Sequence, residues 1–168
     1  MPSYIVHHSL PLTESQQQQI ANGITEIHSR IFTSLSALVN VHFADVSSSR
    51  VFIAGNRREV PNTIQGTLRS GHTRTRAMYD QLCHELITMW DTVARSGKTG
   101  FGEDELRVFL TGGLLAAIEG GFLIPEAGGD GQWFKQNRPE IEKRAAAGQF
   151  ISQTMLKDME VLGDVSLA

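Results

Sequence analysis

Pro2, directly after the initiator methionine, is the first residue of this chain whose chemistry could support catalysis. Removal of Met1 would leave Pro2 with a free secondary amine, and α-amino groups titrate near ~7.7–8.0. Burial or neighbouring cations lower such a pKa further, so a neutral Pro2 amine could carry a proton at physiological pH. The alternative is a Met-Pro start without any catalytic role.

An arginine-rich stretch, residues 69–76, lies between an expected strand and an expected helix and contains Arg69, Arg74 and Arg76. Backbone N–H groups at a helix start favour an anion, and a guanidinium group binds a carboxylate through two hydrogen bonds. The stretch is therefore a candidate site for a small organic acid. The alternative is a charged, solvated helix start.

Glu119 and His28 are two further candidates, and each has a structural explanation beside the functional one. Glu119 closes the almost uncharged run 114–120, so its carboxylate either reaches solvent, which the sequence favours, or lies in a pocket with a raised pKa. His28 lies beside the isoleucines of the expected first helix, which is typical of an exposed or boundary position. The chain has six histidines without metal-ligand spacing, so no metal site is predicted.

The composition excludes several classes of function. The formal net charge of −3 gives no general attraction to nucleic acid or to an anionic membrane, and neither is a predicted partner. Cys83 is the single cysteine, so an internal disulfide is excluded, and we expect its side chain to pack. No apolar run approaches the roughly 18 residues of a membrane span, and no secretory signal is present, so we expect a cytoplasmic protein. Phosphate-loop and dinucleotide motifs are absent, and no cofactor is predicted.

The elements that must position these residues form a pattern that occurs twice. Tyr4 begins a short apolar run, Thr13 and Gln16 form a capping box, and isoleucines at helical spacing follow before an alternating strand over 38–46. The second copy has a strand over 63–68, a long helix with apolar residues at helical spacing from Met78 to Val93, and a strand over 106–110. A short helix is expected over 114–118.

We predict a single α/β (α+β) domain built from two β-α-β units, residues 1–60 and 61–120. The units form one mixed sheet with both helices on one face, and oligomerisation is expected to cover the other face. Residues 121–168 form a C-terminal extension. The pair Trp133-Phe134 indicates that the extension docks on the domain, and a helix is expected to start near Pro139.

In combination, these features resemble the tautomerase superfamily, and most closely its cis-3-chloroacrylic acid dehalogenase-like group. The resemblance covers about residues 2–134 and depends on the order and spacing of several short segments. These segments are Pro2-Ser3-Tyr4, Ile24-Thr25, His28, Val39-Asn40, Val51-Phe52, Leu68-Arg69-Ser70-Gly71, Glu119-x-Gly121 and residues 125–134.

The resemblance implies a tautomerase-like fold and a homotrimer with active sites near the subunit contacts. Carried over by position, it makes Pro2 the catalytic acid or base and His28 the pocket histidine. Arg69 would bind the carboxylate of a small carboxylic-acid substrate, and Glu119 would handle water or a proton. No cofactor is implied.

The sequence departs from the family pattern at two positions. His72 stands where the family has a second arginine, so the carboxylate site loses a permanent charge, which Arg74 or Arg76 would have to replace. Phe109 stands where the dehalogenase has a tyrosine that helps the glutamate to position water, and phenylalanine has no hydroxyl group. Both departures weigh against hydration and dehalogenation and leave proton transfer by proline intact.

Three hypotheses follow from these residues. The first is a cofactor-independent tautomerase that moves a proton in a small enol or keto acid, with Pro2 as general acid and base and with Arg69 and His72 on the carboxylate. The second is a lyase, a hydratase or dehalogenase of unsaturated or 3-halo acids, in which Glu119 activates water. The third is a catalytically silent family member that acts as a binding module.

Overall fold

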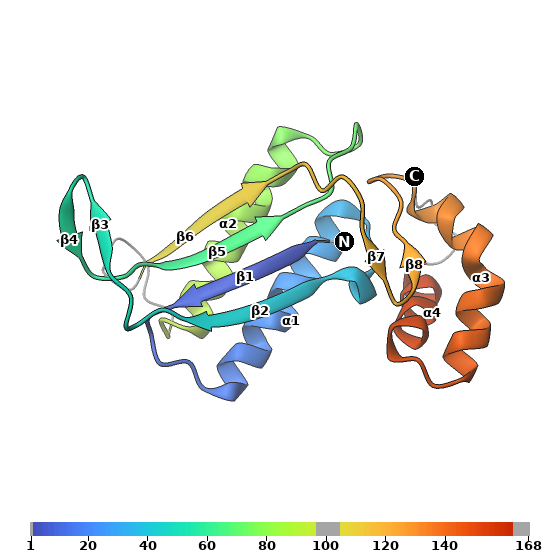
Figure 1. Cartoon of the computed structure of the whole chain (residues 1–168), viewed down its shortest axis with the longest axis horizontal. Helices are drawn as coiled ribbons and strands as arrows, with labels where there is room; N and C mark the ends of the chain where they lie inside the picture. The colour runs from blue at the N-terminus through green and yellow to red at the C-terminus, as the bar shows by residue number, and fades with distance from the viewer. Residues whose placement is uncertain (1, 97–104, 163–168) are drawn as a thin grey trace.

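A four-stranded sheet with two helices on one face forms the body of the molecule, and a second pair of helices lies beside it (Figure 1). The computed structural model describes residues 2–96 and 105–162. The elements of the body are β1 (Ser3–His8), α1 (Glu14–Phe32), β2 (Asn40–Asp45), β5 (Asn62–Thr67), α2 (Arg76–Val93) and β6 (Leu106–Thr111).

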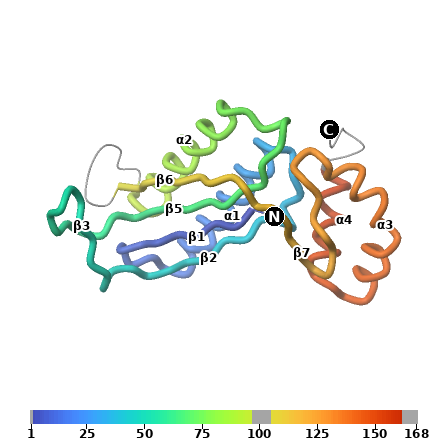
Figure 2. Tube along the Cα trace, turned by 45° about the horizontal axis from the view of Figure 1, so that its top comes forward, coloured from blue at the N-terminus to red at the C-terminus, as the bar shows by residue number. Residues whose placement is uncertain are grey.

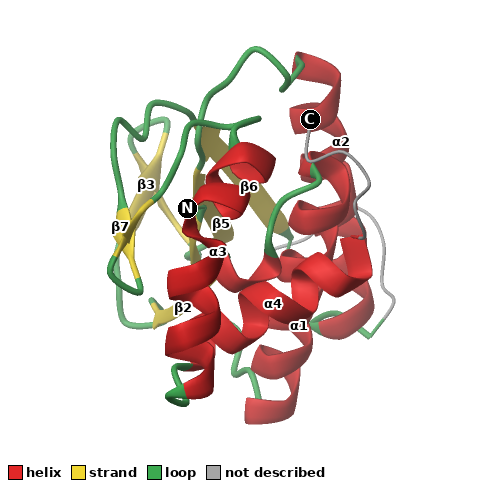
Figure 3. Cartoon of the chain, turned by 90° about the vertical axis from the view of Figure 1, so that its right-hand side faces the viewer, coloured by secondary structure: helices red, strands yellow, loops and turns green. Residues whose placement is uncertain are grey.

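The sheet confirms the two predicted β-α-β units. Its strand order is β2-β1-β5-β6, and each unit contributes a parallel pair, β1 with β2 and β5 with β6. The units meet where β1 pairs antiparallel with β5. In the side view of Figure 3, the helices α1 and α2 cover one face of this mixed sheet.

Helix α1 begins and packs as its sequence predicts. Thr13 caps it, and the capping box with Gln16 is complete in both directions. Ile20 and Ile24 are fully buried on the face that packs against the sheet. Tyr4, Val6 and Ile64 on the strands, and Leu82, Leu86 and Trp90 on α2, complete this first core.

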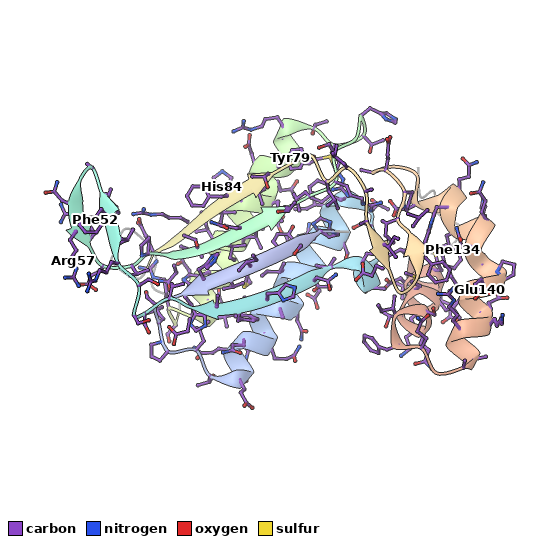
Figure 4. All side chains as sticks on the ribbon, viewed as in Figure 1. Phe52, Arg57, Tyr79, His84, Phe134 and Glu140 are labelled. Carbon is purple, nitrogen blue, oxygen red and sulfur yellow. The ribbon has the colours of Figure 1, made fainter. Side chains whose placement is uncertain are left out.

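The opposite face of the sheet carries no helix of the described residues. Because side chains alternate along a strand, Ile5 and Phe109 point to that side, and they are 38% and 53% exposed. The hairpin of β3 (Val51–Ile53) and β4 (Asn56–Arg58) extends beyond the sheet, with Phe52 and Arg57 on its two strands (Figure 4).

The C-terminal extension docks on the body, as predicted, but its elements differ from those expected. It contains the helices α3 (Asp130–Ala146) and α4 (Phe150–Leu162), which lie beside the sheet in Figure 2, and α4 contacts the short helix η1. Here η1 (Ser36–Leu38) is the short 3-10 helix before β2. A second core joins the two parts: Leu35, Leu38, Phe122, Trp133, Phe134, Ile141 and Met155.

The prediction of a helix start near Pro139 is wrong, because α3 begins nine residues earlier at Asp130 and contains Pro139. Trp133, Ile141 and Ala145 recur at helical spacing on the buried face of α3, so packing favours a continuous helix. Pro139 itself is exposed, where solvent can satisfy the carbonyl that its missing N–H would bind.

The prediction of a short helix over 114–118 is also wrong. Residues 114–117 form no regular element, and Ile118 begins the strand β7 (Ile118–Glu119), which pairs antiparallel with β8 (Phe122–Leu123). Leu115 is 97% exposed, so a helix here would have no core to pack against. No helix within the described ranges is long and apolar enough to cross a membrane.

Candidate active site

One end of the sheet brings together residues that are far apart in the sequence. Strands β1 and β2 begin at this end and β5 ends there, because Ser3 pairs with both Asn40 and Thr67. Pro2 therefore lies beside Asn40, and Arg69 follows two residues after Thr67. Figures 1 and 2 both place the start of β1 next to β7, the strand that carries Glu119.

Asn40 links Pro2 to Glu119. Its backbone N–H donates to the carbonyl oxygen of Pro2 at 3.1 Å, and its side-chain amide donates to Oε1 of Glu119 at 2.8 Å. Pro2 is buried in this arrangement. The sequence singled out Asn40 only within the segment Val39-Asn40, so its bridging position is a structural finding. No feature of the alternating strand, which also carries His42 and Asp45, distinguished Asn40 from its other polar positions.

Glu119 is half-buried, which corrects the sequence-based preference for a solvated carboxylate. Its Oε2 is buried and has no hydrogen-bond partner among the described residues. Burial raises the pKa of Glu119, and the hydrogen bond from Asn40 opposes that shift. The carboxyl group therefore has one oxygen held in place and one oxygen available for a proton or a water molecule.

His28 is fully buried, so the expectation of an exposed or boundary position is wrong. It follows Ile24 by one helical turn and therefore shares the face that packs against the sheet. Its Nδ1 and the hydroxyl of Tyr4 are joined by a hydrogen bond of 2.7 Å, while Nε2 has no partner in the described part of the chain. Burial, together with the charge of Arg74, lowers the pKa of His28 to about 2. The imidazole is therefore neutral at physiological pH.

Arg74 is connected to the Tyr4–His28 pair by the ring of Phe32, which contacts both Arg74 and His28. Its Cζ is 4.2 Å from the centre of the Phe32 ring, which in turn is 4.8 Å from the ring of His28. The ring of Tyr79, which is labelled on α2 in Figure 4, lies 5.5 Å from the ring of Phe32. The Nη1 atom of Arg74 donates to the carbonyl oxygen of Arg69 at 3.0 Å. Burial and the charge of Arg69 lower the pKa of Arg74.

Arg69, the predicted carboxylate ligand, is bound to a carboxylate of the chain itself. It is 3% exposed, and its Nη2 donates to both side-chain oxygens of Asp130 at 3.0 and 3.1 Å. Nη1 donates to the carbonyl oxygen of Pro125 at 2.9 Å, and Nε is buried without a partner among residues that the structure describes. The predicted role of Arg69 in substrate binding stays a prediction, now with Asp130 as a competing partner.

His72 and Phe109, the other candidate substrate-binding residues, lie apart from the Pro2–Asn40–Glu119 group within the chain. His72 is exposed in the loop before α2, and Phe109 points from β6 to the open face of the sheet. A pocket of about 330 Å³ opens beside Arg69 and is lined by residues 69–71, 113–117 and 124–126. Phe109 lines a separate pocket of about 520 Å³ that also includes Tyr79 and Cys83.

The described residues contain no group of three or more histidine, cysteine, aspartate or glutamate side chains that could hold a metal ion. The site brings together groups of acid–base chemistry: the buried Pro2, a carboxyl group with a raised pKa, a neutral tyrosine–histidine pair and two arginines. Such a set can move a proton next to a bound anion.

Comparison with known proteins gives a family match over most of the chain. The model of a tautomerase family described as "Putative oxalocrotonate tautomerase enzyme" matches residues 1–138. No curated protein matches the sequence.

Several solved structures share the fold. A member of the cis-3-chloroacrylic acid dehalogenase family superposes with a TM-score of 0.70 at 22% identity, covering 86% of this chain and 99% of that chain. A probable enzyme from the thermophilic fungus Aspergillus fumigatus has a TM-score of 0.58 at 19% identity, with coverage of 82% and 94%. A fused 4-OT in an asymmetric trimer has a TM-score of 0.53 at 14% identity, with coverage of 66% and 85%.

Proposed function

Because the chain belongs to this oxalocrotonate tautomerase-type family, we propose that it is a cofactor-independent tautomerase of small enol or keto carboxylic acids. The observation that carries the proposal is the link through Asn40, which joins Pro2 to Glu119 at the same end of the sheet as Arg69 and Arg74. Proton transfer needs a neutral base and a nearby cation, and this arrangement supplies both.

Pro2 is the proposed general acid and base once Met1 has been removed. Its amine takes the hydroxyl proton of the enol and returns a proton to carbon, so the keto product has the same composition as the substrate. Pro2 is buried, and burial disfavours the charged form of an amine, so the proposal assigns Pro2 as a neutral base. The hydrogen bond from Asn40 to the Pro2 carbonyl fixes the residue at the start of β1.

Arg74 is the proposed principal ligand of the substrate carboxylate, with Arg69 in a supporting position. The two Nη atoms of Arg69 already donate to Asp130 and Pro125, whereas only Nη1 of Arg74 donates to a carbonyl group in the described structure. Arg74 also lies near the Tyr4–His28 pair, and Tyr4 follows Pro2 by two residues, so their Cα atoms are about 7 Å apart along the strand direction. Positive charge there stabilises a developing enolate.

The test is enol-to-keto conversion of an aryl pyruvate by protein whose mass shows that Met1 is absent. Pro2→Ala leaves a primary amine that is more mobile, so kcat/KM is expected to fall by at least tenfold. Ser3→Ala, next to it on the opposite face of β1, serves as the matched control and keeps its activity. Unchanged activity in Pro2→Ala would refute the role of proline, and an inactive wild-type protein with a free Pro2 would refute the tautomerase proposal.

A lyase reaction is the second candidate, and the environment of Glu119 favours it. A carboxyl group with a raised pKa and a free Oε2 can take a proton from water while Pro2 protonates the neighbouring carbon of an unsaturated acid. With a 3-halo acid, loss of the halide and a proton then follows. Chloride release from 3-chloroacrylate that stops in Glu119→Gln supports this reaction, and absence of chloride release in wild-type protein excludes it for that substrate.

We also propose that the chain works as a homotrimer. One of the similar structures is a fused 4-OT in a trimer, and no helix of residues 2–96 or 105–162 covers the second face of the sheet. Burial of Ile5 and Phe109 on that face would favour association. Light scattering gives the molar mass in solution, and a monomer at micromolar concentration would exclude the trimer.

A further inference from the structure

The strand pair that carries Glu119 is too short to hold its own shape. Strands β7 and β8 have two residues each and form a sheet of their own, separate from the four-stranded sheet. Their turn, Gly120-Gly121, has φ values of +56° and +83°, as in tight two-residue hairpins. The position of Glu119 therefore depends on the residues that contact this turn.

Arg144, near the end of α3, binds the turn directly. Its Nη1 donates to the carbonyl oxygen of Gly120 at 2.6 Å, and Nε2 of Gln149 donates to the same oxygen at 3.2 Å. The guanidinium also lies over the ring of Phe122, with Cζ 4.3 Å from its centre. Nε of Arg144 donates to Glu140 at 2.8 Å, which fixes the guanidinium on α3; Figure 4 labels Glu140 there.

The turn Gly120-Gly121 lies close against the side chain of Arg144 on α3. A Cβ atom at Gly121 would lie 2.5 Å from Nη1 of Arg144, so only glycine allows this approach. On β8, the indole N–H of Trp133 donates to the carbonyl oxygen of Leu123 at 2.6 Å. The helix α3 thus holds both the turn and the returning strand.

The same pair of helices also holds the segment that leads to Asn40. Asp158 on α4 accepts from the hydroxyl of Ser36 at 2.7 Å and from the backbone N–H of Ala37 at 3.0 Å. These residues belong to η1, which ends at Leu38, and the side-chain amide of Asn40 donates to the carbonyl oxygen of Leu38 at 3.3 Å. The approach to Asn40 is therefore tied to α4.

We propose that the helical pair α3–α4 sets the distance between Asn40 and Glu119, with Arg144 and Asp158 as positioning residues. One helix fixes the turn behind Glu119, and the other fixes the segment before Asn40. The inference rests on the proposed role of Glu119 and gives the C-terminal extension a function in the same site.

Two measurements that need no substrate test this proposal in Arg144→Met. Carbon-detected NMR titration of labelled glutamate gives the pKa of Glu119, and hydrogen exchange follows the amide of Ile124, which donates to Ala117 across the hairpin. Loss of a charged hydrogen bond should speed exchange of that amide about tenfold or more. The pKa of Glu119 should fall toward its ordinary value, because a loosened hairpin admits water.

Lys143→Met is the matched control for Arg144→Met. Lys143 is 77% exposed and pairs with the same glutamate, Glu140, without a described contact to the hairpin. Exchange at Ile124 and the pKa of Glu119 should stay at their wild-type values in this variant. The proposal would be overturned if Arg144→Met, with a native circular dichroism spectrum, kept the wild-type exchange rate at Ile124 and the wild-type pKa of Glu119.

A second pair of variants tests the proposed role of Asp158 in positioning Asn40. Asp158→Ala should change the pKa of Glu119 through Asn40, whereas the exposed neighbour Glu160→Ala removes the same charge and should not. In the chloride-release assay, in which Glu119 is the proposed base, Arg144→Met should lower kcat/KM and Lys143→Met should not. Unchanged chloride release in Arg144→Met would show that Arg144 does not act through Glu119. If the wild type releases no chloride, the lyase proposal fails, and the NMR measurements still decide whether Arg144 and Asp158 position the site.

Discussion

Removal of the Asp130 carboxylate should strongly destabilise the fold, because it would leave the Arg69 guanidinium buried without its ionic partner. The side chains of Arg69 and Asp130 are 4% and 6% exposed, so solvent cannot replace the lost carboxylate. Breaking such a buried pair from one side costs about 3–5 kcal/mol of unfolding free energy. We expect Asp130→Ala to fall in that range.

Urea denaturation followed by circular dichroism measures the effect, and a double-mutant cycle separates its causes. The single variants Arg69→Met and Asp130→Leu each leave a buried charge unpaired, whereas the double variant with both changes removes both charges and should recover most of the loss. The control is Asp80→Ala, which breaks the exposed pair of Arg76 and Asp80 and should change the stability far less than Asp130→Ala.

Two results would contradict this reasoning. A cost below about 1 kcal/mol for Asp130→Ala would place Arg69 in contact with water, as for exposed ion pairs. A double variant less stable than either single variant would show that packing, rather than charge, dominates at this position. The first result would leave Arg69 available as a substrate ligand, whereas the second would make its packing, and not its ion pair, the reason for its burial.

Three further predictions concern buried and strained positions. Glu119→Gln should be more stable than the wild type at pH 7, because burial raises the pKa of Glu119 and the stability of the wild type falls as pH rises through that pKa. The urea midpoints of the two proteins should converge below about pH 4, where Glu119 is protonated in both the folded and the unfolded state. Burial lowers the pKa of His28 to about 2, so below pH ~6.5 the unfolded chain binds a proton that the folded chain does not. Relative to His28→Phe, the wild type should therefore lose about 1.4 kcal/mol of unfolding free energy for each pH unit below that point. Denaturation between pH 5 and 7 measures this loss. Gly121→Ala should cost at least about 1–2 kcal/mol in urea denaturation, because φ is +83° and the new Cβ meets Arg144.

Local patterns in the sequence were sufficient to predict the body of the fold. The Thr13 capping box marks the start of α1 correctly, and the spacing of Ile20 and Ile24 identifies its buried face. The prediction for His28 was wrong because a polar residue was expected at the edge of the buried face. His28 follows Ile24 by one helical turn and lies on the same buried face. Burial of a polar side chain depends on a partner, and Tyr4, 24 residues away, is not visible in the helix.

The contacts of the candidate site could not be predicted, because they join residues that are distant in the sequence. Asn40 and Glu119 are 79 residues apart, and Arg69 and Asp130 are 61 residues apart. Only the strand register and the docking of α3 bring these pairs together. Pro139 shows the same limit, because its local preference to begin a helix is overridden by packing on both sides of it.

The division of the apolar residues into two cores has a consequence for synthesis of the chain. Residues 3–111 contain every strand of the four-stranded sheet, so the first core can form while the ribosome is still making the rest. Leu35 and Leu38, however, are fully buried only under side chains from residues 122–155. A nascent chain therefore presents these leucines to solvent until the last helix emerges. We expect this interval to be the stage at which the protein is most prone to aggregate and most dependent on chaperones.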